Sequence, residues 1–360
     1  MSYLQDIVNI IKYDAKQFQR ILQEHRTPEL CLSILRKNGL VLEWISKKHQ
    51  TPEFCLAAIQ ENGISLQYVL EEHKTLELCL IAVENNAHAL HYVPKQHQTL
   101  ELCRIVVQMS GCLLQYIPSE HKTPELCRIA VECDADALQY VPTKYINLEI
   151  CLVAVQRNGM TLEHVPDEYQ TLEICLESVR NSGKSLYDVP KKYQTTEICL
   201  AAVQRNGFAL QYVPKEHQNF DICLAAVKSI GTALNDVPKE HRTPALCLAA
   251  VQNNGYALGY VPITYRTLEL CLIAVQNNGG SLQHVPIIHR TLELCLIATQ
   301  QDGYSLQYVP YEHLNPKMYL AAIQQTKYAF HYIKHHRMVE NNIQYTFNEF
   351  SRSVVIEYIA

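Results

Sequence analysis

The sequence contains no run of about 18 consecutive apolar residues, the length that a membrane-spanning helix requires. Its start, Met1 to Asp6, has no basic segment followed by an apolar one, so it does not resemble a secretory signal. Basic residues are not in excess either, because 31 Lys and Arg stand against 36 Asp and Glu, a net charge of −5. No general field attracts nucleic acid or anionic lipid. These absences predict a soluble protein that is not exported by the Sec pathway and does not enter membranes.

Catalytic and cofactor signatures are missing as well. No Gly-rich phosphate loop, His-Glu-x-x-His, Gly-x-Ser-x-Gly or Cys-x-x-Cys motif occurs. His, Cys and acidic residues are plentiful, but they recur at fixed spacing, whereas a catalytic constellation would be a singular departure. We therefore predict a protein that is not an enzyme and that binds no cofactor and no metal. The 48% of hydrophobic residues nevertheless suffices for a sizeable core.

What the sequence does contain is a repeat of 24 residues, without insertion or deletion over thirteen copies. We number each copy from position 0, which holds His or Tyr. These residues are His25, His49, His73, His97, His121, Tyr145, Tyr169, Tyr193, His217, His241, Tyr265, His289 and His313. A fixed period of this length indicates a solenoid, because one unit cannot bury enough apolar surface alone and must stack on its neighbours.

Each copy begins with the signals of a helix start. Position 2 holds only Thr or Asn, whose side-chain oxygen can accept from a free backbone N–H of the first turn. Pro often follows at position 3 and an acid at position 4, and both suit a first turn. An apolar run such as residues 270–275 comes next, and Gly at position 14 in ten copies, as in Gly279, indicates a left-handed helix end. A helix of ten residues is therefore predicted.

A second, shorter segment follows, with Leu at position 17 and Val or Ile at position 20. Residues three apart share one face of a helical or 3-10 turn, and Pro at position 21 in ten copies ends it. A β-strand remains the alternative, since Tyr-Val before Pro has strand propensity. We predict an all-α fold, a superhelical α-solenoid of about fourteen 24-residue repeats, each an α-helix plus a short α or 3-10 turn.

The two ends of the array depart from the pattern. Residues 1–24 are interpreted as a degenerate N-terminal capping repeat, with Phe18 and Ile21 in the places of Leu and Val. Residues 25–336 hold the thirteen helical repeats. Residues 337–360 predict a C-terminal capping helix, from the spacing of Phe347, Phe350, Val354, Val355 and Tyr358. No linker interrupts the chain, which indicates one continuous domain.

Twelve of the fourteen cysteines occupy position 6, from Cys31 to Cys295. Equivalent residues in stacked helices lie about 8 to 10 Å apart, whereas a disulfide needs Cα atoms within about 7 Å. A zinc site needs about four ligands at one point, and one His and one Cys per repeat form evenly spaced rows instead. We predict a ladder of small buried thiols, and hence a protein of a reducing compartment, the cytoplasm.

Function is expected at positions that the fold leaves free. Positions 12, 15, 18, 22 and 23 vary in charge and size, and position 19 is mostly aromatic but accepts Asp. Such a row is either a ladder between repeats with wet phenol tips or a stripe of partner-contacting rings. Asp188 and Asp236 stand two repeats apart, too far for a catalytic pair. The candidate partner-binding residues are Tyr68, Tyr92, Tyr116, Tyr140, His164, Asp188, Tyr212, Asp236, Tyr260, His284 and Tyr308.

The unit Thr-Leu-Glu-Leu-Cys-Leu-x-Ala-Val-Gln-x-Asn-Gly-x-Ala-Leu-Gln-Tyr-Val-Pro recurs with departures in every copy, for example from Thr267. It resembles the repeats of domain of unknown function family 4116 over residues 25–336. The resemblance implies arrays found largely in bacteria and viruses that live inside amoebae, some of them in proteins translocated into host cells. It implies no catalytic residues. By architecture the unit is also similar to leucine-rich variant repeats, which have the same period and alternate α and 3-10 helices.

Together these features predict a monomeric, non-enzymatic protein–protein interaction scaffold with an unidentified protein partner. The resemblance extends this to an effector of an intracellular microbe, or a viral protein, in the host cytosol. The alternative is modular single-stranded nucleic-acid binding, one base per repeat, with position 19 rings stacking on bases. Its phosphate contacts would be Lys47, Lys95, Lys191, Lys215 and Lys239 at position 22. The negative net charge and the gaps in that lysine row disfavour it. An enzyme acting from residues 337–360 is a third alternative.

Overall fold

The computed structural model describes residues 9–21, 26–332, 337–340, 343–348 and 353–358. The chain divides into two compact units, residues 1–170 and 171–360, whereas the sequence indicated one continuous domain. In a repeat array each repeat contacts only the repeats next to it, so distant repeats are not held together by direct contacts. Both units are helical-repeat solenoids built from the same 24-residue element.

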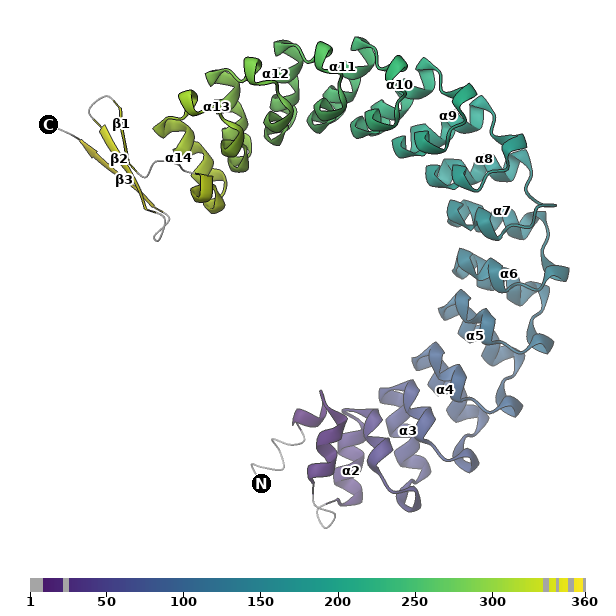
Figure 1. Cartoon of the computed structure of the whole chain (residues 1–360). Helices are drawn as coiled ribbons and strands as arrows, with labels where there is room; N and C mark the ends of the chain where they lie inside the picture. Colours follow the sequence, from purple (N-terminus) through teal and green to yellow (C-terminus); the bar gives the residue numbers. More distant parts are fainter. Residues whose placement is uncertain (1–8, 22–25, 333–336, 341–342, 349–352, 359–360) are drawn as a thin grey trace. The chain divides into compact units, whose positions relative to one another are not determined.

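Each repeat contributes one α-helix of ten residues, except the first, which has eight. The first unit contains α2 (Pro28–Leu35), α3 (Pro52–Glu61), α4 (Leu76–Asn85), α5 (Leu100–Met109), α6 (Pro124–Cys133) and α7 (Leu148–Arg157). The second contains α8 (Leu172–Asn181), α9 (Thr196–Arg205), α10 (Phe220–Ser229), α11 (Pro244–Asn253), α12 (Leu268–Asn277), α13 (Leu292–Gln301) and α14 (Pro316–Gln325). Within each unit successive helices stack side by side (Figure 1). Among the described residues, no helix has the length and apolarity to cross a bilayer.

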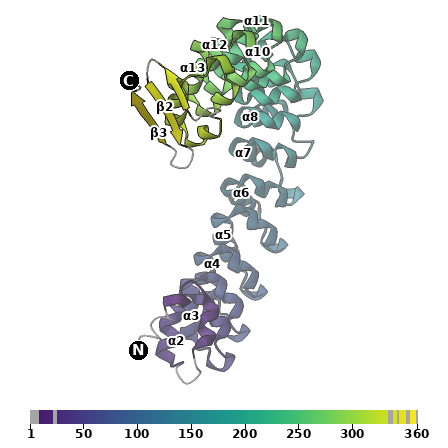
Figure 2. The same cartoon turned by 60° about the vertical axis from the view of Figure 1, so that its left-hand side comes forward.

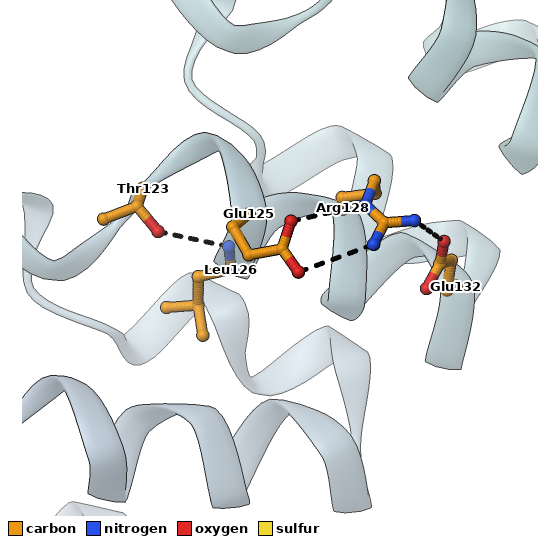
Figure 3. A network of polar contacts seen from close by, with 5 residues as sticks. All are labelled: Thr123, Glu125, Leu126, Arg128 and Glu132. Carbon is orange, nitrogen blue, oxygen red and sulfur yellow. Dashed lines mark hydrogen bonds and ion pairs between the residues drawn. The ribbon is translucent and has the colours of Figure 1, made fainter.

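The helix starts are those predicted from the sequence. In α2 through α14 the Thr or Asn at position 2 accepts a hydrogen bond from the backbone N–H three residues on. Figure 3 shows one case, in which Leu126 N donates to Thr123 Oγ1 at 3.1 Å. On the same exposed face Arg128 pairs with Glu125 and Glu132. Solvent-exposed pairs of this kind add little stability, so the caps define the helix starts.

A 3-10 helix follows each α-helix, which confirms the short helical segment and excludes the strand alternative there. These are η1 (Ala15–Arg20), η3 (Gly39–Trp44), η5 (Gly63–Tyr68), η7 (Ala87–Tyr92), η9 (Gly111–Tyr116), η11 (Ala135–Tyr140), η13 (Gly159–His164), η14 (Gly183–Tyr187), η16 (Gly207–Tyr212), η18 (Gly231–Asp236), η20 (Gly255–Tyr260), η22 (Gly279–His284), η24 (Gly303–Tyr308) and η26 (Lys327–Tyr332). Before η1, residues 9–11 are α-helical as well.

A further three-residue 3-10 turn, which the sequence did not reveal, closes most repeats after position 21. That position holds Pro except before η4 and η6, where it holds Ser46 and Leu70. These turns are η4 (Lys47–His49), η6 (Glu71–His73), η8 (Lys95–His97), η10 (Ser119–His121), η12 (Thr143–Tyr145), η15 (Lys191–Tyr193), η17 (Lys215–His217), η19 (Lys239–His241), η21 (Ile263–Tyr265), η23 (Ile287–His289) and η25 (Tyr311–His313). They carry positions 22, 23 and 0 and so display three side chains per repeat.

The glycines of position 14 serve close packing, and the predicted left-handed helix end was wrong. None of those whose surroundings are described has a positive φ. A Cβ added to Gly255 would overlap the carbonyl oxygen of Ala274 in the next repeat, and one on Gly279 would lie 2.6 Å from that of Ala298. The residue before the glycine, such as Asn254 with φ −148°, ends the helix in extended conformation and caps the 3-10 helix. Glycine here therefore lets neighbouring repeats approach.

The core is the same in every repeat. Position 6 cysteines, position 17 leucines and position 20 valines point inward, and Cys271, Leu282 and Val285 are representative, each at most 1% exposed. All fourteen cysteines are free thiols, and the twelve of position 6 are buried, so the predicted thiol ladder is confirmed. Because nearly all of this core lies between repeats, stability depends on nearest-neighbour stacking.

Asn side chains at position 12 form hydrogen bonds with the backbone of the preceding repeat. Asn253 Oδ1 accepts from Gly231 N at 2.6 Å, and its Nδ2 donates to Lys228 O at 2.8 Å. Asn85 and Asn277 make the equivalent pairs of bonds. The first Asn of the recurrent Asn-Asn-Gly motif thus satisfies backbone groups at the end of the preceding helix.

The two ends of the chain differ from each other. At the N-terminal end Asp14 caps η1, and Phe18 and Ile21 are buried. At the C-terminal end the predicted capping helix over residues 337–360 was wrong, because three antiparallel strands occur in the order β1-β2-β3 (Figure 2). They are β1 (Arg337–Glu340), β2 (Ile343–Asn348) and β3 (Ser353–Tyr358). Phe347 pairs with Val354 across β2 and β3, Val355 and Tyr358 lie in β3, and Phe350 lies outside the described residues. The β-branched run Val354 to Ile356 favours a strand over the helical spacing.

Candidate binding surface

The 3-10 helix determines which side chains reach the surface. In η20, Ala257, Leu258 and the following Val261 are buried, because they face the neighbouring helices. Positions 15, 18 and 19 point the other way, and Tyr256 and Tyr260 there are 37% and 38% exposed. The same pattern recurs in most repeats, although Gly280 at position 15 is buried. The variable positions 15, 18 and 19 thus form a row on the surface of each of the two units.

The predicted partner-binding residues of position 19 are partly exposed along this row. Tyr116 and Tyr260 are exposed, and the others are half-buried, namely Tyr68, Tyr92, Tyr140, His164, Asp188, Tyr212, Asp236, His284 and Tyr308. A half-buried ring with an accessible edge fits both interpretations of the row. The structure therefore places these residues on the same kind of partly exposed surface in their repeats.

Several position 19 rings pack against a ring of the preceding repeat. His91 and Tyr116 have ring centroids 4.3 Å apart, and Tyr187 and Tyr212 are 5.4 Å apart, both edge-on. Tyr256 stands edge-on to His284 at 6.3 Å. Edge-on aromatic pairs at these distances are favourable, and they extend the row into a continuous aromatic surface at these repeats.

The departures from Tyr at position 19 have distinct surroundings. Asp188 ends the shorter helix η14 in helical conformation, whereas Asp236 accepts from Asn235 Nδ2 at 3.3 Å. Burial raises the pKa of Asp236, and Asn235 and Arg242 oppose that shift. Burial and the nearby Arg266 lower the pKa of His284. These groups lie in separate repeats, and among the described residues no three His, Cys, Asp or Glu side chains gather as a metal site would require.

Two thiols lie outside the ladder. Cys133 is exposed and Cys112 is half-buried. Burial, with a hydrogen bond to the Asp134 carboxylate, raises the pKa of Cys112 to about 12, and burial raises that of ladder thiols such as Cys271 to about 11. A raised pKa leaves little thiolate at neutral pH, so Cys112 and the ladder thiols are not activated nucleophiles.

Sequence reasoning missed a row of arginine side chains at position 1 that donate hydrogen bonds to backbone carbonyl oxygens. Arg266 donates to three carbonyl oxygens, those of Val261 and Gly259 in one 3-10 segment and that of His284 in the next, each at 2.9 Å. Arg242 and Arg290 make the equivalent three bonds. In most other repeats the place holds Gln or Lys with fewer bonds, as Gln218 shows. It holds Ile146 and Leu314 in two repeats, and Arg26 in the first repeat also donates to three carbonyl oxygens. The signal was the recurrence of Arg at 242, 266 and 290, which period counting alone could have found.

The three-residue 3-10 turns that close the repeats differ in the residue at position 22. Lys at position 22 is followed by Glu in two of the five lysine turns, η17 and η19, which is unfavourable for phosphate contacts. In η21, η23 and η25 the lysine is replaced by Ile263, Ile287 and Tyr311, exposed by 66%, 75% and 61%. The proposed lysine row for nucleic acid is therefore interrupted in three consecutive repeats.

Fold and surface together define the class, a helical-repeat solenoid with a constant core and a variable outer row. A model of the family described as a domain of unknown function (DUF4116) matches residues 27–74, 51–98, 147–194, 196–242, 245–290 and 267–315. The matches overlap and cover more than half of the chain, so the protein belongs to this family, as the sequence motif indicated. No curated protein matches the chain.

Proposed function

We propose that this protein is a non-enzymatic scaffold that binds another protein along the row of positions 15, 18 and 19. The observation that supports the proposal is the contrast between interior and surface. The interior repeats the same Cys, Ala, Leu and Val, while the row holds exposed side chains as different as Asp136, Lys184 and Phe208. Large variable surfaces on a regular solenoid suit extended recognition, and exposed Tyr rings are common interface anchors.

The compartment and the nature of the partner are part of the same proposal. Twelve buried free thiols suit a reducing compartment, where disulfide exchange does not threaten the core. The family resemblance points to microbes and viruses of amoebae. We therefore take a cytosolic protein of the host as the partner, with this chain acting as a translocated or viral protein.

Affinity capture from amoeba cytosol tests the scaffold proposal. The variant carries Tyr212→Asp and Tyr308→Asp, since position 19 already holds Asp at 188 and 236 and the fold accepts it. We expect a protein retained by the native chain and lost from the variant at equal helicity by circular dichroism. The control Tyr193→His exchanges two residues that both occur at position 0, and it should retain the protein. Equal retention by all three chains would overturn the binding role of the row.

A further inference from the structure

Apolar side chains are exposed on three consecutive turns of the second unit. We call Ile263, Ile287, Ile288 and Tyr311 the turn patch. Position 22 is lysine in five other repeats, and position 23 is charged in most of them. Ile288 is 84% exposed, more than any other side chain of the patch. Scattered exposed apolar residues are ordinary, but a group on adjacent repeats marks an interaction site.

Cations lie directly beside the turn patch. Arg266 follows η21 and Arg290 follows η23 in the chain, and each guanidinium uses three of its five N–H groups for backbone carbonyls. Neither forms an ion pair with a carboxylate in the described part of the chain. Burial lowers the pKa of Arg266, as expected for a cation that has lost water without gaining a counter-charge.

The carboxylate that other repeats supply is missing at this place. In the last turn Glu312 and Arg290 both act on the pKa of the Cys295 thiol, so the acid at position 23 and the arginine at position 1 of the same repeat share one neighbourhood. The residue equivalent to Glu312 is Ile288 for the repeat of Arg266 and Thr264 for the repeat of Arg242. Two successive arginines, Arg242 and Arg266, therefore lack the acid at position 23 of their own repeat.

A depression of about 770 Å³ opens beside these arginines. Three cations line it, Lys239, Arg242 and Arg266, against one carboxylate, Glu240. Gly259 stands in its wall where most repeats have a longer side chain at position 18, and Tyr260 and Ile263 form its apolar part. In a chain of net charge −5 this is a cationic and apolar site.

We propose that the turn patch and this depression bind a protein segment that presents a carboxylate to Arg266 and Arg242 and apolar side chains to the isoleucines. This inference rests on the proposed scaffold function and names the chemistry of its partner. Nucleic acid fits less well, because it has no apolar side chains for Ile287 and Ile288 and its phosphates would meet Glu240 and Glu312. A second copy of the chain fits less well too, because a two-fold contact would place this cationic face against itself.

Selection of short random peptides by display on the whole chain tests the proposal. We expect enriched peptides that carry Asp or Glu beside apolar residues. Two variants borrow residues from other repeats, so the fold accepts them: Ile287→Lys with Ile288→Glu copies the turn of Lys215 and Glu216, and Arg266→Gln copies Gln218. Each should weaken binding of the selected peptides at least tenfold by fluorescence anisotropy. A control with Lys215→Ala and Glu216→Ala should bind as the native chain does.

Other outcomes overturn the inference in identifiable ways. Failure to enrich any peptide, enrichment without acids, or equal binding by the native chain and both variants would each contradict it. A dimer in sedimentation that Ile287→Lys with Ile288→Glu dissolves would assign the patch to a second copy. If these variants bind normally while Tyr212→Asp with Tyr308→Asp loses the captured protein, the scaffold function stands and this inference fails. If neither set of variants loses any partner, both proposals fail.

Discussion

Two adjacent glycines, Gly279 and Gly280, should differ in how well they tolerate substitution by alanine. Gly279→Ala would place a methyl group 2.6 Å from the carbonyl oxygen of Ala298, a rigid backbone atom of the next repeat. Gly280→Ala would meet the hydroxyl end of Tyr256, which can rotate away. We expect Gly279→Ala to lower the free energy of unfolding by about 1 to 3 kcal/mol, and Gly280→Ala to change it far less, as measured by urea denaturation.

The natural sequence supplies a comparison for that experiment. Ala87 and Ala135 occupy the place of Gly279 in their own repeats and are 6% exposed, so a methyl group is accommodated where the neighbouring repeat has adjusted. Equal stability of the two glycine variants would show that the repeats around Gly279 adjust as readily, and would contradict the close-packing role of the glycine.

His284 gives the protein a pH dependence with a definite sign. Because burial and Arg266 lower its pKa in the folded chain, unfolding raises that pKa toward about 6.5 and takes up a proton. Stability contributed by His284 is thus complete above about pH 6.5 and is lost as pH falls below it. We expect His284→Tyr, the usual residue at position 19, to reduce the drop in urea midpoint between pH 7.5 and 5.5. An identical drop in both chains would contradict the assignment.

At the scale of the helix, the N-cap at position 2 is the feature that every repeat shares. Leu270 N donates to Thr267 Oγ1 at 3.3 Å. Thr267→Ala leaves this N–H without its partner and should cost about 1 kcal/mol. Thr267→Asn should be nearly neutral, because Asn147, Asn219 and Asn315 cap their helices in the same way. Thermal unfolding of the two variants measures the difference in their stability. An equal loss of stability in Thr267→Ala and Thr267→Asn would contradict the capping role of this side chain.

The sequence predicted those elements that have a local chemical signal repeated in every copy. The sequence predicted caps such as Thr267, the buried thiols and the short helical segment before Pro286, because thirteen copies show which residue each position requires. The role of Gly279 was predicted wrongly. A glycine that recurs at position 14 does not show whether a positive φ or the nearby carbonyl oxygen of the next repeat requires it. The strands after residue 336 were missed because a single non-repeated segment offers no such comparison.

The candidate surface was predicted less completely than the fold. Position 19 was found because its variation is visible against a constant core. Arg266 and Ile288 were missed, since their meaning depends on positions 1 and 23 lying beside each other in the folded repeat, and that is tertiary information. Comparing positions column by column cannot show that the acid opposite Arg266 has been lost.

At the scale of the whole molecule, the cysteines report on opening of the repeat array. Cys133 is exposed and should react quickly with a thiol reagent, while the twelve buried thiols react only when their repeats open. On its N-terminal side the repeat of Cys31 stacks only on the degenerate capping repeat, whereas the repeat of Cys103 has a full repeat on each side, so Cys31 should be labelled before Cys103. Mass spectrometry of peptides after timed alkylation measures the order, and Cys133→Ser should remove the fast phase. Simultaneous labelling of Cys31 and Cys103 would instead indicate that the repeats of the first unit open together.

The constant length of the repeat has a consequence for how such a protein can change over generations. Every copy begins with the same cap, ends with a comparable turn and meets its neighbours through the same kinds of contact. Unequal crossing-over between two copies would therefore add or remove whole units without creating a new type of junction. A duplicated unit that carries Ile287, Ile288 and Arg290 would bring its outer face with it, so recognition can be lengthened in steps of one repeat.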